Sequence, residues 1–249
     1  MGAHARTTKR SRRRALTTER DAARRAAALA DATVVASPDD PVYRARVARA
    51  LERLDAEAIE RRLARRDVAA LVVEPIQGKG VWEADESTWR RVQATCRRFG
   101  TLLVIDEVQT GMGRTGRFLC HQHWGLEPDI VTVSKALSGG YVPVGAALMT
   151  EEVHAATFTS LERAVVHSST FSRNQLAMVA GLATLQVLDD EDLIGNAARR
   201  GDQLRTALAP LVERYDLFHE VRGKGLMVGL AFGPPAGAGR TRFRLLERA

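Results

Sequence analysis

The chain has 249 residues, of which 45% are hydrophobic, and a formal net charge of +7. No run of about 18 apolar residues occurs, so we expect no membrane-spanning helix, and no apolar stretch of the kind found in a secretory signal follows the N-terminal arginines. Two cysteines, Cys96 and Cys120, are too few for a disulfide framework. These features exclude membrane and disulfide-rich secreted classes, and they predict a cytoplasmic protein with one large domain or two small ones.

The positive charge is concentrated at the N-terminus. Residues 1–30 contain nine Lys or Arg residues and two acidic residues, so the remainder of the chain is neutral. We expect a disordered basic tail over residues 1–35. Nucleic-acid binding by this tail is the alternative, and it is less favoured because no aromatic residue stands among the charges to stack on bases.

The next residues predict alternating helices and strands. Val47, Leu51, Leu54 and Ile59 recur near helical spacing, which predicts one or two amphipathic helices over residues 37–67. Strands are expected in "ALVVEPIQG", "TLLVIDEVQTG", "DIVTVSKA" and "GAALMT", and a helix closed by Gly100 separates the first two. Continuous apolar strands that alternate with helices are typical of a parallel sheet covered on both faces.

The C-terminal part predicts a change of architecture. Two long helices are expected over residues 173–215, with a break near Asp189 and Asp190. Two strands are expected in "LFHEVRGKGLMVGLAF", with a turn at Gly223 to Gly225. The sequence therefore predicts an α/β fold in three parts: a tail over 1–35, a large-domain segment over 36–218, and the incomplete beginning of a small α+β domain over 219–249.

Three motifs within residues 102–124 suggest competing functions. The strand that ends in Asp106 and Glu107 is typical of P-loop ATPases, but the G-x-x-x-x-G-K-[ST] loop that those enzymes require is absent from the sequence. "GMGRTG" has the spacing of a dinucleotide fingerprint, but the sequence after it predicts no helix. "CHQHW" places Cys120, His121 and His123 together without a fourth zinc ligand at suitable spacing, so we interpret them as loop side chains.

A fourth arrangement joins two strands. Asp106 ends one predicted strand and Lys135 ends the next, and ligands of parallel α/β sheets bind at the carboxyl ends of the strands. A lysine and a carboxylate that face one cavity match the needs of pyridoxal phosphate. The amine can form a Schiff base with the aldehyde, and the carboxylate can pair with the protonated ring nitrogen.

Longer motifs surround these two residues. In order along the chain stand "VVEPIQGKGV", "LLVIDEVQTGMGRTGRF", "PDIVTVSKALSGGYVPVGA", "HSSTFSRNQLA" and "EVRGKGLMVGL". Over residues 67–232 the sequence resembles the class III, ornithine-aminotransferase-like pyridoxal-phosphate enzymes of fold type I, and within that group the putrescine and acetylornithine types. The resemblance implies an aminotransferase that moves an amino group from an ω-amine or amino acid donor to a 2-oxo acid.

The resemblance also implies the residues that hold the cofactor ring. Lys135 would be the Schiff-base lysine and would then shuttle a proton. Asp106 would bind the pyridine nitrogen. Val108 would pack on the ring face, and Gln109 would hydrogen-bond the phenolic oxygen.

Three further residues receive roles from the same resemblance. Thr170 would bind the cofactor phosphate, which in this family occurs across a dimer interface. Glu74 would line the substrate side of the site. Arg114 would support the glycine-rich turn rather than take part in the chemistry. No metal site is implied.

Parts of the family pattern have no counterpart in the sequence. Family subunits carry an upstream Gly/Ser/Thr-rich turn that cradles the phosphate and an upstream aromatic residue that stacks on the ring. Residues 1–66 match neither, since the one aromatic residue there, Tyr43, stands in an unmatched context. We therefore expect a copy of the fold that is truncated at both ends and that forms a homodimer or joins a completing subunit. The alternative function is a catalytically impaired fragment or a non-catalytic partner subunit.

Overall fold

A computed structural model of the chain describes residues 54–165 and 170–233. The predicted tail over residues 1–35, part of the first predicted helical region and residues 234–249 lie outside these ranges. None of the described helices is both long and apolar enough to cross a lipid bilayer.

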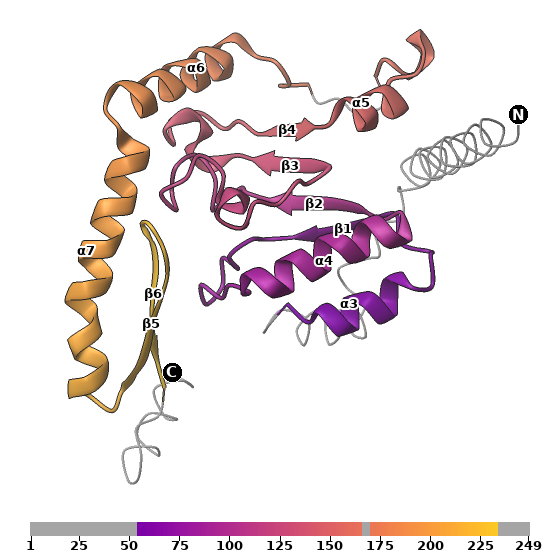
Figure 1. Ribbon diagram of the computed structural model, residues 1–249. Helices are drawn as coiled ribbons and strands as arrows, with labels where there is room; N and C mark the ends of the chain where they lie inside the picture. The colour runs from indigo at the N-terminus through magenta and orange to yellow at the C-terminus, as the bar shows by residue number, and fades with distance from the viewer. Residues whose placement is uncertain (1–53, 166–169, 234–249) are drawn as a thin grey trace, which may run out of the picture.

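A four-stranded sheet forms the centre of the fold (Figure 1). In order across the sheet, its strands are β1 (Ala70–Val73), β2 (Leu102–Asp106), β3 (Ile130–Val133) and β4 (Ala146–Met149). The first three run parallel, with Val72 opposite Val104 and Asp106 opposite Thr132. The apolar, β-branched runs of the sequence therefore form strands, and the predicted α/β fold with a mainly parallel sheet is confirmed.

The fourth strand departs from the parallel arrangement. β4 pairs antiparallel to β3, with Val133 opposite Ala146. Residues 134–145 join the two strands and contain a short 3-10 helix, η2 (Lys135–Ser138), followed by Gly139 and Gly140. A parallel return requires a crossover, which is usually a helix. This connection contains only the short η2 and no crossover helix, and β4 returns antiparallel beside β3.

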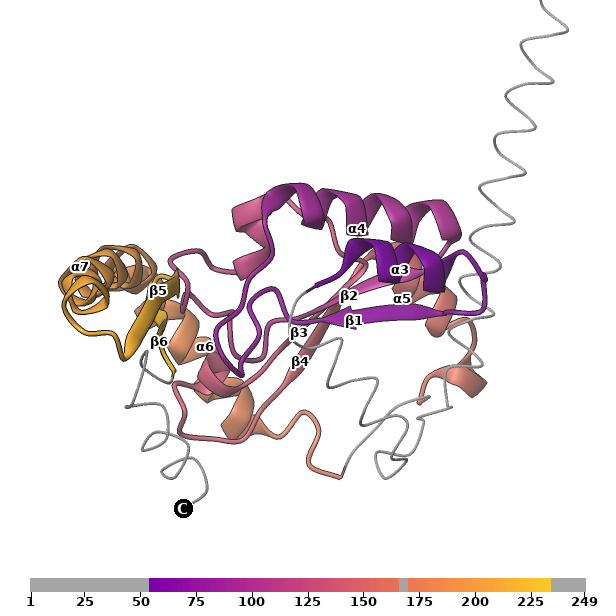
Figure 2. The same cartoon turned by 90° about the horizontal axis from the view of Figure 1, so that it is seen from below.

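Two helices cover one face of the sheet (Figure 2). They are α3 (Ala56–Leu63) and α4 (Glu86–Phe99). Asp85 caps α4 by accepting the N–H of Thr88 at 2.7 Å, and Gly100 ends it at a φ of 72°, as the sequence predicted. On the opposite face Val72 remains 62% exposed, so the expected cover of both faces is incomplete over the described residues.

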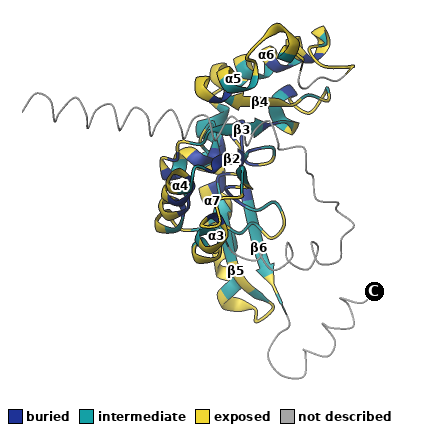
Figure 3. Ribbon diagram, turned by 90° about the vertical axis from the view of Figure 1, so that its right-hand side faces the viewer, coloured by how far each residue is buried: buried dark blue, intermediate teal, exposed yellow. Residues whose placement is uncertain are grey.

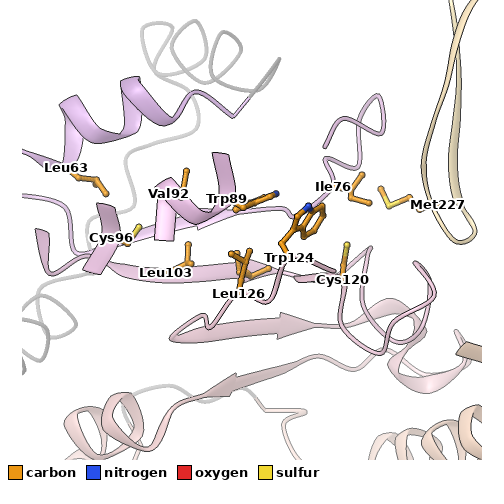
Figure 4. Close-up of a cluster of buried hydrophobic side chains, with 11 residues drawn as sticks. Leu63, Ile76, Trp89, Val92, Cys96, Leu103, Cys120, Trp124, Leu126 and Met227 are labelled. Atoms are coloured by element: carbon orange, nitrogen blue, oxygen red, sulfur yellow. The ribbon is translucent and has the colours of Figure 1, made fainter. Parts of the chain in front are cut away.

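The main core lies between these helices and the sheet. Trp89 of α4 and Trp124 pack with their ring centroids 5.8 Å apart, and Leu103 of β2 belongs to the same buried cluster. Figure 4 shows Met227, from a hairpin far along the chain, beside Ile76 at one end of this cluster. The burial map in Figure 3 shows β2 among the most buried parts of the molecule.

The remaining elements extend beside the sheet. They are α5 (Glu151–Thr157), η3 (Leu161–Arg163), α6 (Gln175–Asp190), α7 (Leu193–Arg214), β5 (Phe218–Lys224) and β6 (Met227–Phe232). Asp192, with a φ of 47°, separates α6 from α7 close to the predicted break. β5 and β6 form an antiparallel hairpin that turns at Gly225 and Leu226 and packs along α7 (Figure 1).

Candidate active site

Three of the predicted site residues share one edge of the sheet. Because β1, β2 and β3 are parallel, their carboxyl ends lie at the same edge. Glu74 directly follows β1, Asp106 is the last residue of β2, and Lys135 stands two residues after β3. Asp106 is paired with Thr132, three residues before Lys135. The topology therefore places the acid and the amine on neighbouring strands at one edge.

The Asp106 carboxylate accepts hydrogen bonds from the residues that follow β2 and from the neighbouring strand β3. Leu103 and Ile105 belong to the core under α4, so the alternation of a strand turns Asp106 to the opposite face. Its Oδ1 accepts the N–H of Val108 at 2.9 Å and the hydroxyl of Thr132 at 3.3 Å. Both of these hydrogen bonds use Oδ1, so Oδ2 can accept a hydrogen bond from a ligand.

Lys135 has an unusual backbone conformation. Its φ is 46°, a left-handed conformation that costs a non-glycine residue about 1–2 kcal/mol and that clusters at functional sites. The preceding residue, Ser134, is fixed by its hydroxyl, which donates to the carbonyl of Val144 at 2.6 Å. The Lys135 side chain is exposed, and no described residue forms an ion pair with it. Its amine is therefore accessible at the edge where Asp106 lies.

Gln109 and Glu74 meet at Gly78, in the loop that follows β1. The N–H of Gly78 donates to Oε2 of Glu74. The amide oxygen of Gln109 lies where a Cβ on Gly78 would stand, so the absence of a side chain at residue 78 permits this close approach. Val108 is half-buried between Asp106 and Gln109 in the chain. The loops after β1 and β2 are thus in direct contact beside the carboxylate of Asp106.

The "GMGRTG" loop, residues 111–116, packs against helix α7. Gly113 and Gly116 have φ angles of 84° and 85°. A Cβ on them would stand 2.9 Å from the side chain of Ile194 and 2.8 Å from that of Ala198. The carbonyl of Arg114 accepts a backbone N–H of the β5–β6 turn at 2.9 Å. The glycines therefore permit turns and close packing, which agrees with the rejection of a dinucleotide fingerprint.

Glu107 is a buried acid that the sequence did not place in the site. Its side chain has no solvent exposure. The carboxylate accepts the hydroxyl of Thr110 at 2.7 Å, the N–H of Cys120 at 2.9 Å and the N–H of His121 at 2.8 Å. His121 Nδ1 lies 3.0 Å from the same carboxylate. Since an ionised carboxylate can only accept, this nitrogen carries the proton.

The hydrogen bonds to Glu107 decide its charge. Burial acts to raise the pKa of this carboxyl, but the donors on His121, Thr110 and Cys120 outweigh burial and hold the pKa below its usual value. Glu107 is therefore an ionised carboxylate at neutral pH, and each of its four contacts is charge-assisted.

The interpretation of "CHQHW" as loop side chains was wrong. These residues form a 3-10 helix, η1 (Cys120–Trp124), in which Cys120, His121 and Trp124 are buried. His123 Nε2 lies 3.1 Å from the carbonyl oxygen of Thr115. Burial lowers the pKa of His123 and raises that of the Cys120 thiol. Over the described ranges, no group of three or more His, Cys, Asp or Glu side chains is arranged to hold a metal ion.

Thr170 stands apart from the other predicted site residues. It is exposed in the segment that leads into α6, directly after residues 166–169, which lie outside the described ranges. In the part of the chain that the structure describes, no hydrogen bond joins Thr170 to the residues at the sheet edge.

The helix that follows Thr170 does approach the site. α6 packs on η2, and a Cβ on Gly181 would stand 3.6 Å from the carbonyl oxygen of Leu137.

Comparison with known proteins identifies the family. A sequence model of the class-III aminotransferases matches residues 4–246. The chain belongs to this family. Among proteins of known structure, the ornithine aminotransferase of Toxoplasma gondii ME49 is 37% identical with a TM-score of 0.67. An amine transaminase from an uncultivated Pseudomonas species, solved in its PLP-bound form, is 40% identical with a TM-score of 0.67.

The chain spans less than half the length of these relatives. The match to the Toxoplasma enzyme covers 72% of this chain and 42% of that enzyme, and the match to the Pseudomonas enzyme covers 75% and 43%. Aminotransferase PigE of Serratia sp. (strain ATCC 39006) is 42% identical over 179 residues, which are 72% of this chain and 21% of PigE.

Proposed function

We propose that the chain is the cofactor-binding part of a pyridoxal-phosphate-dependent aminotransferase that moves an amino group from an ω-amine or amino acid donor to a 2-oxo acid. The observation that carries this proposal is the placement of Asp106 and Lys135 at the carboxyl ends of neighbouring parallel strands. Membership of the class-III aminotransferases supports it.

The residues at this edge fit pyridoxal phosphate. When bound, this cofactor supplies an electron sink for a carbanion at the substrate carbon. Oδ2 of Asp106 would accept a hydrogen bond from the protonated ring nitrogen, since Oδ1 already accepts hydrogen bonds from Val108 and Thr132. The exposed Nζ of Lys135 would hold the cofactor aldehyde and then carry a proton to and from the substrate carbon.

The neighbouring residues would complete the site. Gln109, which lies against Gly78, would donate its amide N–H to the phenolic oxygen, and Val108 would pack on the ring face. Glu74 lies at the same edge, where its carboxylate accepts the N–H of Gly78, and it would line the substrate side. Thr170 would bind the phosphate.

The exposed position of Thr170 supports a homodimer, in which each subunit would provide this residue to its partner's site. Three apolar side chains of α6 that follow Thr170 in the chain, Leu176, Val179 and Leu182, are 67%, 64% and 68% exposed. A helix that is apolar on all sides is normally buried, so a second copy or a completing subunit would cover this surface.

The separate two-stranded sheet of β5 and β6 supports a domain division near residue 218, where β5 begins. In this proposal, residues 36–218 belong to the large domain and residues 219–249 begin a small one, with residues 1–35 as a tail. Both cysteines are free thiols, which supports a location in the reducing cytoplasm.

A titration of the full-length chain with pyridoxal phosphate tests the proposal. The visible absorbance of bound cofactor should saturate in the natural chain and be lost in Lys135→Ala. Lys79→Ala is the matched control, because Lys79 is an exposed lysine in the loop after β1 and reports unspecific reaction. Adding an amine should change the band, and a 2-oxo acid should restore it.

Two outcomes would count against the proposal. An unchanged band in Lys135→Ala would show that cofactor binding does not depend on this lysine. A band that responds to no amine would preserve cofactor binding but reject amino-group transfer.

A further inference from the structure

Glu107 closes the base of a loop that carries two of the proposed site residues. The loop, residues 108–119, leaves β2 after Asp106 and returns at η1. Glu107 stands before the loop, and its carboxylate accepts hydrogen bonds from Cys120 and His121, which follow the loop directly. One buried carboxylate therefore joins the two ends of the loop.

The same residue is fixed through its backbone. The N–H of Glu107 donates to the carbonyl of Thr132 at 2.9 Å, which extends the pairing of β2 and β3, and its own carbonyl accepts the N–H of Gly111 at 2.9 Å. Thr110 donates to its carboxylate as well. These contacts fix the first turn of the loop, where Val108 bonds the Asp106 carboxylate and Gln109 reaches Gly78.

We propose that Glu107 and His121 are positioning residues of the active site, whose buried contact holds the start of loop 108–119 and thereby orients Asp106 and Gln109. The proposal rests on the proposed function for the identity of the ligand. Both residues are buried, and the hydrogen bonds of the Glu107 carboxylate go to Thr110, Cys120 and His121. They act through Val108 and Gln109 rather than by touching the cofactor.

Asp129 offers a matched control for a carboxylate that only stabilises the fold. Its Oδ2 accepts the N–H of Leu103 at 2.8 Å, and its own N–H donates to the carbonyl of Leu103 at 2.9 Å. Asp129 precedes β3, whereas Lys135 follows it, so Asp129 lies at the opposite edge of the sheet. Asp129→Asn and Glu107→Gln both replace a backbone-binding carboxylate by an amide of the same shape.

The first measurement is hydrogen exchange in the cofactor-free full-length chain. Glu107→Gln places an N–H₂ group among hydrogen-bond donors, so at least one hydrogen bond that holds the loop is lost. Each charge-assisted hydrogen bond contributes more than about 1.4 kcal/mol, so amide exchange in residues 108–119 should accelerate by about tenfold or more. Asp129→Asn should leave exchange in this loop unchanged. Equal loop protection in Glu107→Gln and the natural chain would overturn the proposal.

The second measurement is the affinity for pyridoxal phosphate, with variants of the histidine. His121→Leu removes the Nδ1 donor and should weaken binding by about tenfold, since a hydrogen bond to a charged group contributes about 1.5–3 kcal/mol. His121→Asn retains a side-chain N–H near the same place and should restore most of the affinity. A rescue of this kind separates positioning from a general loss of stability.

The outcomes distinguish this proposal from the proposed function. If Asp129→Asn and Glu107→Gln lower the melting temperature equally and weaken cofactor binding equally, the contact between Glu107 and His121 does not position the site. If the natural chain shows no cofactor absorbance, the proposed function fails, and exchange in the cofactor-free chain still decides whether Glu107 holds the loop.

Discussion

Two adjacent acids at the end of β2 lie in different surroundings, because strand alternation turns their side chains to opposite faces. Asp106 is half-buried and keeps Oδ2 available at the sheet edge, whereas Glu107 is fully enclosed and surrounded by four donors. The pKa of Glu107 is lowered by those donors against the effect of burial. One acid can therefore serve a ligand, and the other supports the loop.

We expect Asp106→Asn to weaken cofactor binding while the fold stays intact. The amide oxygen of Asn can still accept the N–H of Val108, so the free energy of unfolding should change by less than about 1 kcal/mol. The loss of negative charge opposite a protonated ring nitrogen should reduce affinity by about ten- to a hundredfold, the range for a hydrogen bond to a charged group. Absorbance titration and thermal melting measure the two effects.

Asp85→Asn is the control for this substitution. Asp85 also accepts a backbone N–H, as the N-cap of α4, and Asn is an equally good cap. This variant should match the natural chain in both measurements. If Asp106→Asn binds the cofactor as tightly as the natural chain, Asp106 does not pair with the ring nitrogen.

At this scale the sequence singled out residues that belong to family motifs, and their roles stay predictions. It did not single out Glu107, whose hydrogen-bond partners come much later in the chain. Asp106 and Lys135 could be placed at one edge because strand ends are visible in the apolar pattern. Glu107 could not be assigned, because its donors Cys120 and His121 come 13 and 14 residues later. The one available signal was an acid directly after a buried strand, where a carboxylate requires partners.

At the scale of elements, the glycine-rich loop shows how packing can imitate a ligand motif. Gly113 and Gly116 are required by positive φ angles and by the approach of α7. The loop therefore couples the end of β2 to the helix and hairpin that follow much later in the chain. Its G-x-G-x-x-G spacing reflects this contact.

We expect Gly116→Ala to destabilise the chain more than Gly100→Ala. Both positions have similar φ angles, 85° and 72°, so each substitution carries a left-handed cost of about 1–2 kcal/mol. A Cβ on Gly100 would meet no atom within 4 Å, whereas a Cβ on Gly116 would stand 2.8 Å from Cβ of Ala198. Overpacking should add about 1–3 kcal/mol in Gly116→Ala, as measured by urea unfolding.

The double variant Gly116→Ala with Ala198→Gly isolates this contact. Removing the methyl group of Ala198 should recover most of the overpacking term, although Gly in a helix costs about 1 kcal/mol by itself. A double-mutant cycle gives the interaction energy. Equal losses in Gly100→Ala and Gly116→Ala would show that α7 does not constrain the loop.

The sequence predicted most elements and failed on one direction. The end of α4 at Gly100 and the break before α7 follow from local chemistry that a single segment contains. The direction of β4 depends on whether residues 134–145 form a crossover, and an apolar run looks the same in either direction. The 3-10 helix η1 was missed because its order derives from the buried carboxylate of Glu107.

At the scale of the whole molecule, large apolar surfaces remain exposed. α6 and β4 are mostly exposed in Figure 3, although both contain mainly apolar residues. Monomeric proteins seldom expose extended apolar surface without an interaction that covers it. The opposite side of α6, including Ala177 and Gly181, is buried, so the helix is apolar toward the fold and toward solvent alike.

We expect Val179→Glu to dissociate the proposed homodimer without unfolding the subunit. Val179 lies between Leu176 and Leu182 on the exposed side of α6 and is 64% exposed, so a charge there costs the isolated subunit little. In a two-fold dimer the substitution occurs twice in one interface, and burying an unpaired charge costs several kcal/mol. The dissociation constant should therefore rise by at least about a hundredfold.

Sedimentation of the full-length chain measures this change, with Leu204→Glu as the control. Leu204 lies on α7 and is 42% exposed, so the control adds the same charge to a partly exposed apolar position outside the α6 surface. Dissociation by Val179→Glu alone would assign the interface to α6, and the loss should be accompanied by weaker cofactor binding if Thr170 acts across it. If both variants sediment like the natural chain, another surface joins the subunits, or the chain acts without a second copy.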